Sequence, residues 1–450
     1  MTTPFQHPFL TGRILPTLLR LAAPNTITMT SSTLVSIAET TYVGRLGVPS
    51  LAGLTLIFPL IMMMQMMSGG AMGGGVSSAI SRSMGAADHE RTAALPFCAV
   101  LISLTGGLIF SSLMWLFGPA LFALMGGRGE VLAQATAYSR IAAGGILLMW
   151  VSNTLGAIMR GSGRMGPPAV IGLVAGVAQI CVGGLLGLGL FGAPRMGITG
   201  VALGMFASIA LSMALSLVFL RRPGLQVPLR FDTAFLRWPL FADILRVGGL
   251  AVLSPLQSTT TVMVLTGLVA RFGVEAVAGY GIGARLEFLL IPLAFSVGVA
   301  SLPMVGVAIG AGQVERAKQV AWVSSAVAAG ALGVIGLGFA VFPHLWAGLF
   351  THDANVLAAT STYLRFAAVG FPFLGAGLSL YFSAQGAGRI GGPILAQTSR
   401  LAVVVIGGWA LTAAHAPIFA LFLLIAGSMV ALGLGAILAV RLTPWGLHAH

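Results

Sequence analysis

Glu39 is an acidic residue within a long apolar stretch of the sequence. Thr28, Ser32 and Ser36 precede it, and the successive spacings of 4, 4 and 3 residues place all four side chains on one face of a helix. Because a charge in mid-membrane costs about 3 kcal/mol, this face is expected to line water or protein rather than lipid. A carboxyl group in such a place can bind and release a proton. The alternative is a structural carboxylate held by neighbouring hydroxyl groups.

Glu287 is the second acid inside an apolar stretch. Arg285 is two residues away and therefore does not share its helical face. Two interpretations stay open for Glu287. It either contributes to a substrate cleft or forms a structural ion pair, between helices or with a different arginine.

A further polar feature runs from Gln257 to Thr261, near the positions that an internal repeat assigns to the polar part of the first helix. Two such helices would line the walls of a central cleft, although Ser and Thr also bond to carbonyls of their own helix. Met64 lies in a methionine run that suits varied apolar ligands, and ordinary helix packing explains this run as well. The residues expected to line the cleft are Thr28, Ser32, Ser36, Tyr42, Gln179, Gln257, Thr260, Glu287 and Met64.

The composition requires these side chains to be carried by membrane helices. Of 450 residues, 23 are basic and 10 acidic, so 7% are charged, whereas 57% are hydrophobic. A soluble domain has about 25% charged residues, and a disordered chain is rich in charge, so both classes are excluded. The net charge of +13 is scattered, which argues against a nucleic-acid partner. The 2 cysteines and 7 histidines form no ligand pattern, and we predict no metal or other cofactor.

Uncharged apolar runs of about 20 residues or more are long enough to cross a membrane as helices. The sequence contains twelve such runs, and Pro59, Pro292 and Pro303 predict kinks within them. The predicted spans are 21–43, 51–80, 94–125, 131–159, 168–192, 197–220, 247–270, 277–309, 319–350, 357–385, 392–413 and 417–440.

The basic residues predict the orientation of these spans. Fifteen of the 23 basic residues fall in segments on the side of the N-terminus and four on the opposite side. Since loops rich in Lys and Arg stay in the cytoplasm, both termini are expected to be cytoplasmic.

The chain also repeats itself. The block RLGVPSLAG from Arg45 matches RFGVEAVAG from Arg271, and GAADHER from Gly85 matches GAGQVER from Gly310. AYSRIAAGG from Ala137 likewise matches TYLRFAAVG, again about 225 residues later. The repeat predicts two lobes of six helices each, related by a pseudo-two-fold axis along the membrane normal, with a substrate cleft between them. The predicted division is an N-lobe over 1–220, a cytoplasmic linker over 221–246 and a C-lobe over 247–450.

The ordered set of motifs resembles the multidrug and toxic compound extrusion (MATE) family. The motifs that carry the resemblance are the early Pro24, ETTYVGRLGVPSLAG from Glu39, SRSMGAADHERTA from Ser81, GSGRMGPP from Gly161, MGITGVALG from Met196, and the copies in the second half. The resemblance spans nearly the whole chain. It implies a twelve-helix antiporter that exports bulky, often cationic organic compounds in exchange for H⁺ or Na⁺.

Glu39 stands where this family usually has an aspartate in the first helix. Where members with a cation site in the N-lobe carry Asn and Asp in the fifth helix, this chain has Gln179 and Gly183, and Met205 replaces a usual Thr. The acids that another branch carries in the seventh and tenth helices are absent from 247–270 and 357–385. A hard cation such as Na⁺ wants several oxygen ligands, so H⁺ coupling through Glu39 is favoured.

The sequence therefore predicts a proton-coupled, monomeric efflux transporter of the bacterial inner membrane. The alternative is a flippase for lipid-linked oligosaccharides, which would need a strongly cationic cleft. Only four arginines lie within predicted spans, namely Arg140, Arg285, Arg365 and Arg400. An intramembrane enzyme is disfavoured because no nucleophile, base and metal-ligand set converges in the sequence.

Overall fold

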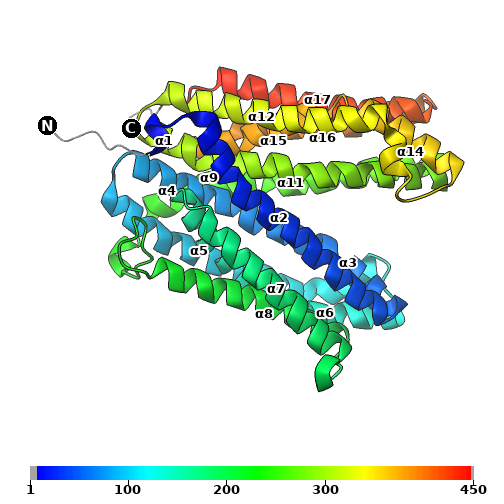
Figure 1. The fold of residues 1–450 in the computed structure, drawn as a ribbon, viewed down its shortest axis with the longest axis horizontal. Helices are drawn as coiled ribbons and strands as arrows, with labels where there is room; N and C mark the ends of the chain where they lie inside the picture. The colour runs from blue at the N-terminus through cyan, green and yellow to red at the C-terminus, as the bar shows by residue number, and fades with distance from the viewer. Residues whose placement is uncertain (1–7, 447–450) are drawn as a thin grey trace. The chain divides into compact units, whose positions relative to one another are not determined.

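The protein is built from helices. The structure, a computed structural model, describes residues 8–446, and no strand occurs among them (Figure 1). Its contacts define two compact units, each of which is described by itself. The N unit comprises residues 24–84 and 88–249, and the C unit comprises 8–23, 85–87 and 250–446. The lobe boundaries at 220 and 246 inferred from the sequence stay a prediction.

In the N unit, α5 packs along α6, α7 along α8, and α6 along both α3 and α8. The helices α2 and α9 each continue into the C unit at one end. The elements are α2 (Ile14–Arg45), α3 (Val48–Gln65), η1 (Met66–Met72), α4 (Gly73–Gly85), α5 (His89–Leu124), α6 (Gly129–Gly161), α7 (Gly166–Leu188), η2 (Leu190–Gly192), α8 (Ile198–Leu220), η3 (Thr233–Phe235) and α9 (Trp238–Ala251).

In the C unit, α15 packs against α11, α12 and α17, and α16 lies against α10 and α17. The elements are α1 (Pro8–Thr11), α10 (Leu253–Val269), η4 (Ala270–Phe272), α11 (Val274–Gly310), α12 (Val314–Val341), α13 (Pro343–Ala347), α14 (Ala354–Ala367), α15 (Phe371–Gly386), α16 (Gly391–Ala413) and α17 (Ile418–Leu442).

The number of helices that are long and apolar enough to cross a membrane comes close to the twelve spans predicted from the sequence. Ten helical stretches within residues 8–446 are long and apolar enough to cross a membrane, and the bent pair α14 and α15 supplies an eleventh. The remaining long helix, α2, has 32 residues, but its many Thr and Ser side chains make it less apolar. Glu39 is therefore carried by the least apolar of the long helices in the described part of the chain.

Prolines explain where helices depart from the predicted runs. The expected run 319–350 is interrupted at Phe342, because Pro343 disfavours helical geometry at the residue before it. The run 357–385 is bent by 56° between α14 and α15, just before Pro372. Within the segment 221–246, expected to be a linker, α9 already begins at Trp238.

Close backbone contact holds α7 against α8, which lie side by side (Figure 1). A Cβ atom on Gly204 of α8 would lie 2.5 Å from the Cα atom of Gly183 in α7. A Cβ on Gly200 would likewise lie 2.5 Å from the carbonyl carbon of Leu186. Only glycine fits at these positions, and the resulting close packing fixes the face of α7 that is turned toward α2.

Candidate ion-coupling site

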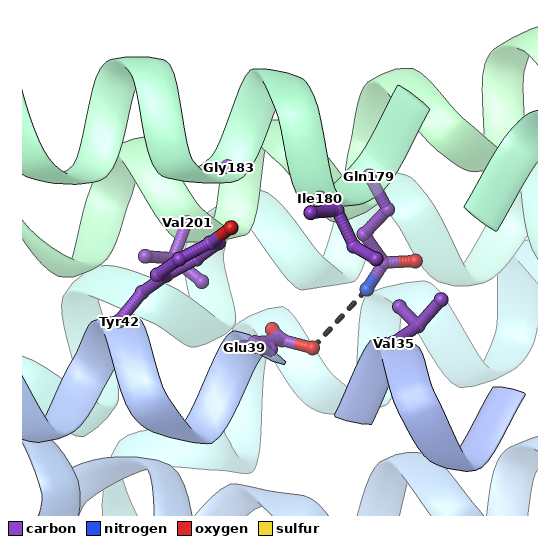
Figure 2. A pocket seen from close by; sticks show the side chains of 7 residues that line it. All are labelled: Val35, Glu39, Tyr42, Gln179, Ile180, Gly183 and Val201. Carbon is purple, nitrogen blue, oxygen red and sulfur yellow. Dashed lines mark hydrogen bonds between the residues drawn. The ribbon is translucent and has the colours of Figure 1, made fainter. Parts of the chain in front are cut away.

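Glu39 of α2 is held by one side chain from α6 and one from α7. The Tyr138 hydroxyl donates a hydrogen bond of 2.8 Å to Oε1, and the Gln179 amide donates one of 3.1 Å to Oε2 (Figure 2). Both carboxylate oxygens thus have a neutral partner. Tyr138 is itself 1% exposed. No ion pair to Glu39 occurs among residues 8–446, so its charge has no cationic partner there.

A small pocket opens beside this carboxylate. Figure 2 shows Glu39 and Tyr42 on α2 pointing toward α7, with the Gln179 amide directed at Glu39. The space that this pocket leaves for a water-sized sphere is about 10 Å³, which is room for about one water molecule. The pocket therefore suits an ion or a single water molecule rather than a bulky organic compound. Its lining residues are Val35, Glu39, Tyr42, Gln179, Ile180, Gly183 and Val201.

Only part of the predicted polar stripe on α2 takes part in this site. The Thr28 hydroxyl donates to the Pro24 carbonyl and the Ser32 hydroxyl to the Thr28 carbonyl, each at 3.0 Å. These two hydroxyl groups therefore form hydrogen bonds within α2 itself. Ser36 is partly exposed, and its carbonyl accepts from Thr40.

Tyr138 is the residue of this site that the sequence reasoning did not single out. It lies in the repeated AYSR block, but its contact with Glu39 joins positions 99 residues apart. The same hydroxyl also lies 3.4 Å from Sδ of Met205, the residue that stands where the family usually has a threonine. Membership of a repeated block was the one sequence signal that pointed to Tyr138.

Glu287 of α11 forms an ion pair with an arginine of another helix. Arg400 of α16 lies 3.4 Å from its Oε1 atom, and the Tyr363 hydroxyl donates to Oε2 at 3.3 Å. The neighbouring Arg285 instead lies over the Phe350 ring at 5.3 Å. The ion-pair interpretation thus matches the geometry, whereas a role in substrate binding stays a prediction.

The remaining predicted cleft residues have local partners, and their place in a substrate cleft stays a prediction. Gln257 donates to the Thr398 hydroxyl at 2.7 Å, and Thr260 donates to the Leu256 carbonyl at 2.9 Å. Met64 is 8% exposed, and its role in contacting ligands stays a prediction. Within residues 8–446, no group of three or more His, Cys, Asp or Glu side chains is placed to hold a metal ion.

Gly204 gives a direct test of how α7 positions the site. In Gly204→Ala the added Cβ would lie 2.5 Å from Cα of Gly183 and 3.0 Å from the Gln179 carbonyl oxygen. We expect α8 to move away from α7, at a cost of about 1–3 kcal/mol, and Gln179 to lose its bond to Glu39. The thermal midpoint and gradient-driven transport should both fall. Gly267→Ala is the control, since nothing lies within 4 Å of its new Cβ. If Gly204→Ala had the thermal midpoint and the transport rate of the wild type, close packing at Gly204 would not be what positions Gln179.

Comparison with known proteins places the chain in a family. The MatE family model matches residues 24–185 and again 251–410, which is most of the chain and agrees with the internal repeat. The FAD transporter of Shewanella oneidensis is 26% identical over 366 residues, covering 80% of this chain and 79% of that protein. The probable multidrug resistance protein NorM of Thermotoga maritima is 25% identical over 345 residues, covering 76% and 73%.

Solved structures show the same fold. The Vibrio cholerae MATE transporter VcmN superimposes with a TM-score of 0.88 over 95% of this chain and 96% of that one, at 21% identity. Together, the repeated architecture and the family match favour a transporter over the enzyme alternative. The chain belongs to the MatE family and is a multi-pass membrane transporter.

Proposed function

We propose that this transporter exports organic compounds, including drugs, in exchange for H⁺, with Glu39 as the group that binds and releases the proton. The observation that carries the proposal is the bonding of Glu39: a carboxylate in a membrane helix with two neutral donors, a small pocket and no cationic partner among residues 8–446. Without a compensating cation, a proton is the simplest species that neutralises it.

The names of the relatives support export of organic compounds. Several are called multidrug resistance proteins, among them NorM of Thermotoga maritima and PmpM of Pseudomonas aeruginosa. The Shewanella oneidensis relative is named for FAD. Because the pocket at Glu39 is too small for such compounds, we propose that it serves the coupling ion and that the compound binds elsewhere.

The donor set at Glu39 favours H⁺ over Na⁺. A sodium ion would need several oxygen ligands. Gly183 offers no side-chain oxygen, Met205 offers a sulfur atom, and Gln179 turns its amide nitrogen toward Glu39. Protonation of Glu39 from outside would change its bonds to α6 and α7, and this change would favour a different packing of α2.

One proton per cycle is energetically sufficient. A charge crossing the membrane gains about 2.3 kcal/mol per 100 mV, and a tenfold gradient of a neutral compound costs about 1.4 kcal/mol. For a monovalent cationic compound, one-for-one exchange is electroneutral, and only the pH gradient drives it. A location in the bacterial inner membrane and a monomeric state are part of the proposal. So are cytoplasmic termini, which the distribution of basic residues supports.

Two matched gradients test the coupling ion. In proteoliposomes, a gradient of one pH unit and a tenfold Na⁺ gradient each supply about 1.4 kcal/mol. We expect the pH gradient alone to drive transport of ethidium, a monovalent cation, in either buffer. Transport driven by the Na⁺ gradient at constant pH, with none driven by the pH gradient, would overturn the proposal.

A further inference from the structure

The C unit contains a buried polar cluster that the proposed proton exchange does not use. Glu287 of α11 is bonded by Arg400 of α16 at 3.4 Å and by Tyr363 of α14 at 3.3 Å. Tyr280 packs edge-on against Tyr363, with ring centroids 5.4 Å apart. The side chains of Arg400 and Glu287 are 10% and 15% exposed. The cluster is therefore a charged group inside an apolar helical bundle, where every charge is costly unless it has a use or a partner.

The internal repeat shows how this cluster differs from the one at Glu39. A shift of 225 residues pairs Tyr138 with Tyr363, and each of these buried tyrosines donates to a carboxylate of its own unit. The same shift pairs Arg400 with Ala175 in the first half. The arginine is thus specific to the C unit. Because the Tyr138–Glu39 pair exists without an arginine, a tyrosine–carboxylate pair does not in itself require an arginine.

Arg400 is poorly satisfied by the partners that it has. A guanidinium group carries five N–H donors in a planar fork, and a charge-assisted bond to a carboxylate is normally about 2.7–2.9 Å long. The contact with Glu287 is 3.4 Å. The Nε atom of Arg400 is buried and has no hydrogen-bond partner among the described residues. A buried arginine with one long contact and an unpaired donor retains capacity for another anion.

We propose that Arg400 binds a phosphate or carboxylate group of a transported compound, with Glu287 occupying the guanidinium in the absence of that group. This inference rests on the proposed export function and adds a substrate class to it. An incoming phosphate offers three acceptor oxygens and matches the guanidinium fork in a bidentate manner. It can therefore engage the unpaired Nε, which Glu287 does not. Glu287 keeps its bond from Tyr363 while the anion is bound.

A matched pair of ligands isolates the phosphate. FMN and riboflavin share the same ring and ribityl chain and differ by one phosphate group. Equilibrium dialysis of the purified full-length protein in detergent, without any gradient, gives the ratio of the two dissociation constants. Since a hydrogen bond to a charged group is worth about 1.5–3 kcal/mol, we expect FMN to bind about tenfold or more tightly than riboflavin.

Three variants connect this ratio to the cluster. Arg400→Gln alone leaves a buried unpaired carboxylate and can fail to fold, so the double variant Glu287→Gln with Arg400→Gln removes both charges together. The double variant should bind FMN and riboflavin with equal dissociation constants. Glu287→Gln alone removes the internal competitor and should raise the FMN preference above that of the wild type. Arg285→Gln, on the same helix as Glu287, is the control that should leave the ratio unchanged.

The outcomes separate this inference from proton coupling. A double variant that keeps the FMN preference, or a wild type that has none, overturns the role of Arg400. If the preference depends on Arg400 but a pH gradient drives no export, the anion site stands and the proposed coupling fails. Adding phosphatidic acid distinguishes the source of the anion. If it competes with FMN in the wild type but not in the double variant, the site is assigned to a lipid headgroup. If it does not compete, the site is assigned to a soluble compound.

Discussion

Glu39→Gln is expected to reduce transport driven by a pH gradient to the rate of protein-free liposomes. The amide keeps the shape of the side chain and can still accept from Tyr138, but it can no longer bind and release a proton. A carrier that cannot exchange the proton retains no means of using the gradient, even if its compound-binding surface is intact. The measurement is ethidium transport in proteoliposomes at a gradient of one pH unit.

Two controls give this result its meaning. Binding of ethidium to Glu39→Gln in detergent should persist, which separates loss of coupling from loss of folding. Glu130→Gln removes another carboxylate, in the exposed first turn of α6, and should transport at the wild-type rate. Undiminished transport by Glu39→Gln under the same gradient would remove Glu39 from the mechanism.

Asp243→Asn is expected to cause the largest loss of stability. Asp243 of α9 accepts hydrogen bonds from Arg82 of α4 at 2.8 Å and from Arg91 of α5 at 2.6 Å. The side chains of Arg82 and Asp243 are only 15% and 20% exposed. Asparagine would leave two nearby arginines without a counter-charge, and breaking such a pair costs about 3 kcal/mol.

A nearby exposed pair is the matched control for Asp243. Glu90 of α5 pairs with Arg237, which directly precedes α9, at 2.8 Å, but these side chains are 68% and 62% exposed. Exposed pairs contribute about 0–1 kcal/mol, so Glu90→Gln should leave the thermal midpoint nearly unchanged. The midpoint, followed by tryptophan fluorescence, should fall by several degrees in Asp243→Asn. Equal midpoints for the two variants would show that the Asp243 network does not hold α9 to α4 and α5.

The sequence by itself determined the spans and the acids within them. The cost of placing polar groups in a bilayer depends on residues that are close along the chain. The membrane helices and the unusual position of Glu39 therefore follow from local composition. The run 319–350 was expected to be a single helix, but it is interrupted before Pro343. The repeat likewise pairs Tyr138 with Tyr363.

The tertiary structure decided which side chains meet. The repeat suggests equivalent roles for the two tyrosines, yet their acids come from different helices of each repeat, Glu39 from its first helix and Glu287 from its second. Arg400 lies 113 residues from Glu287 along the chain, and no spacing rule connects them. Whether two side chains form a hydrogen bond depends on the rotation of each helix about its axis and on how closely the two backbones approach, as at Gly204. The pattern of hydrophobic residues along the chain determines neither the rotation nor the separation.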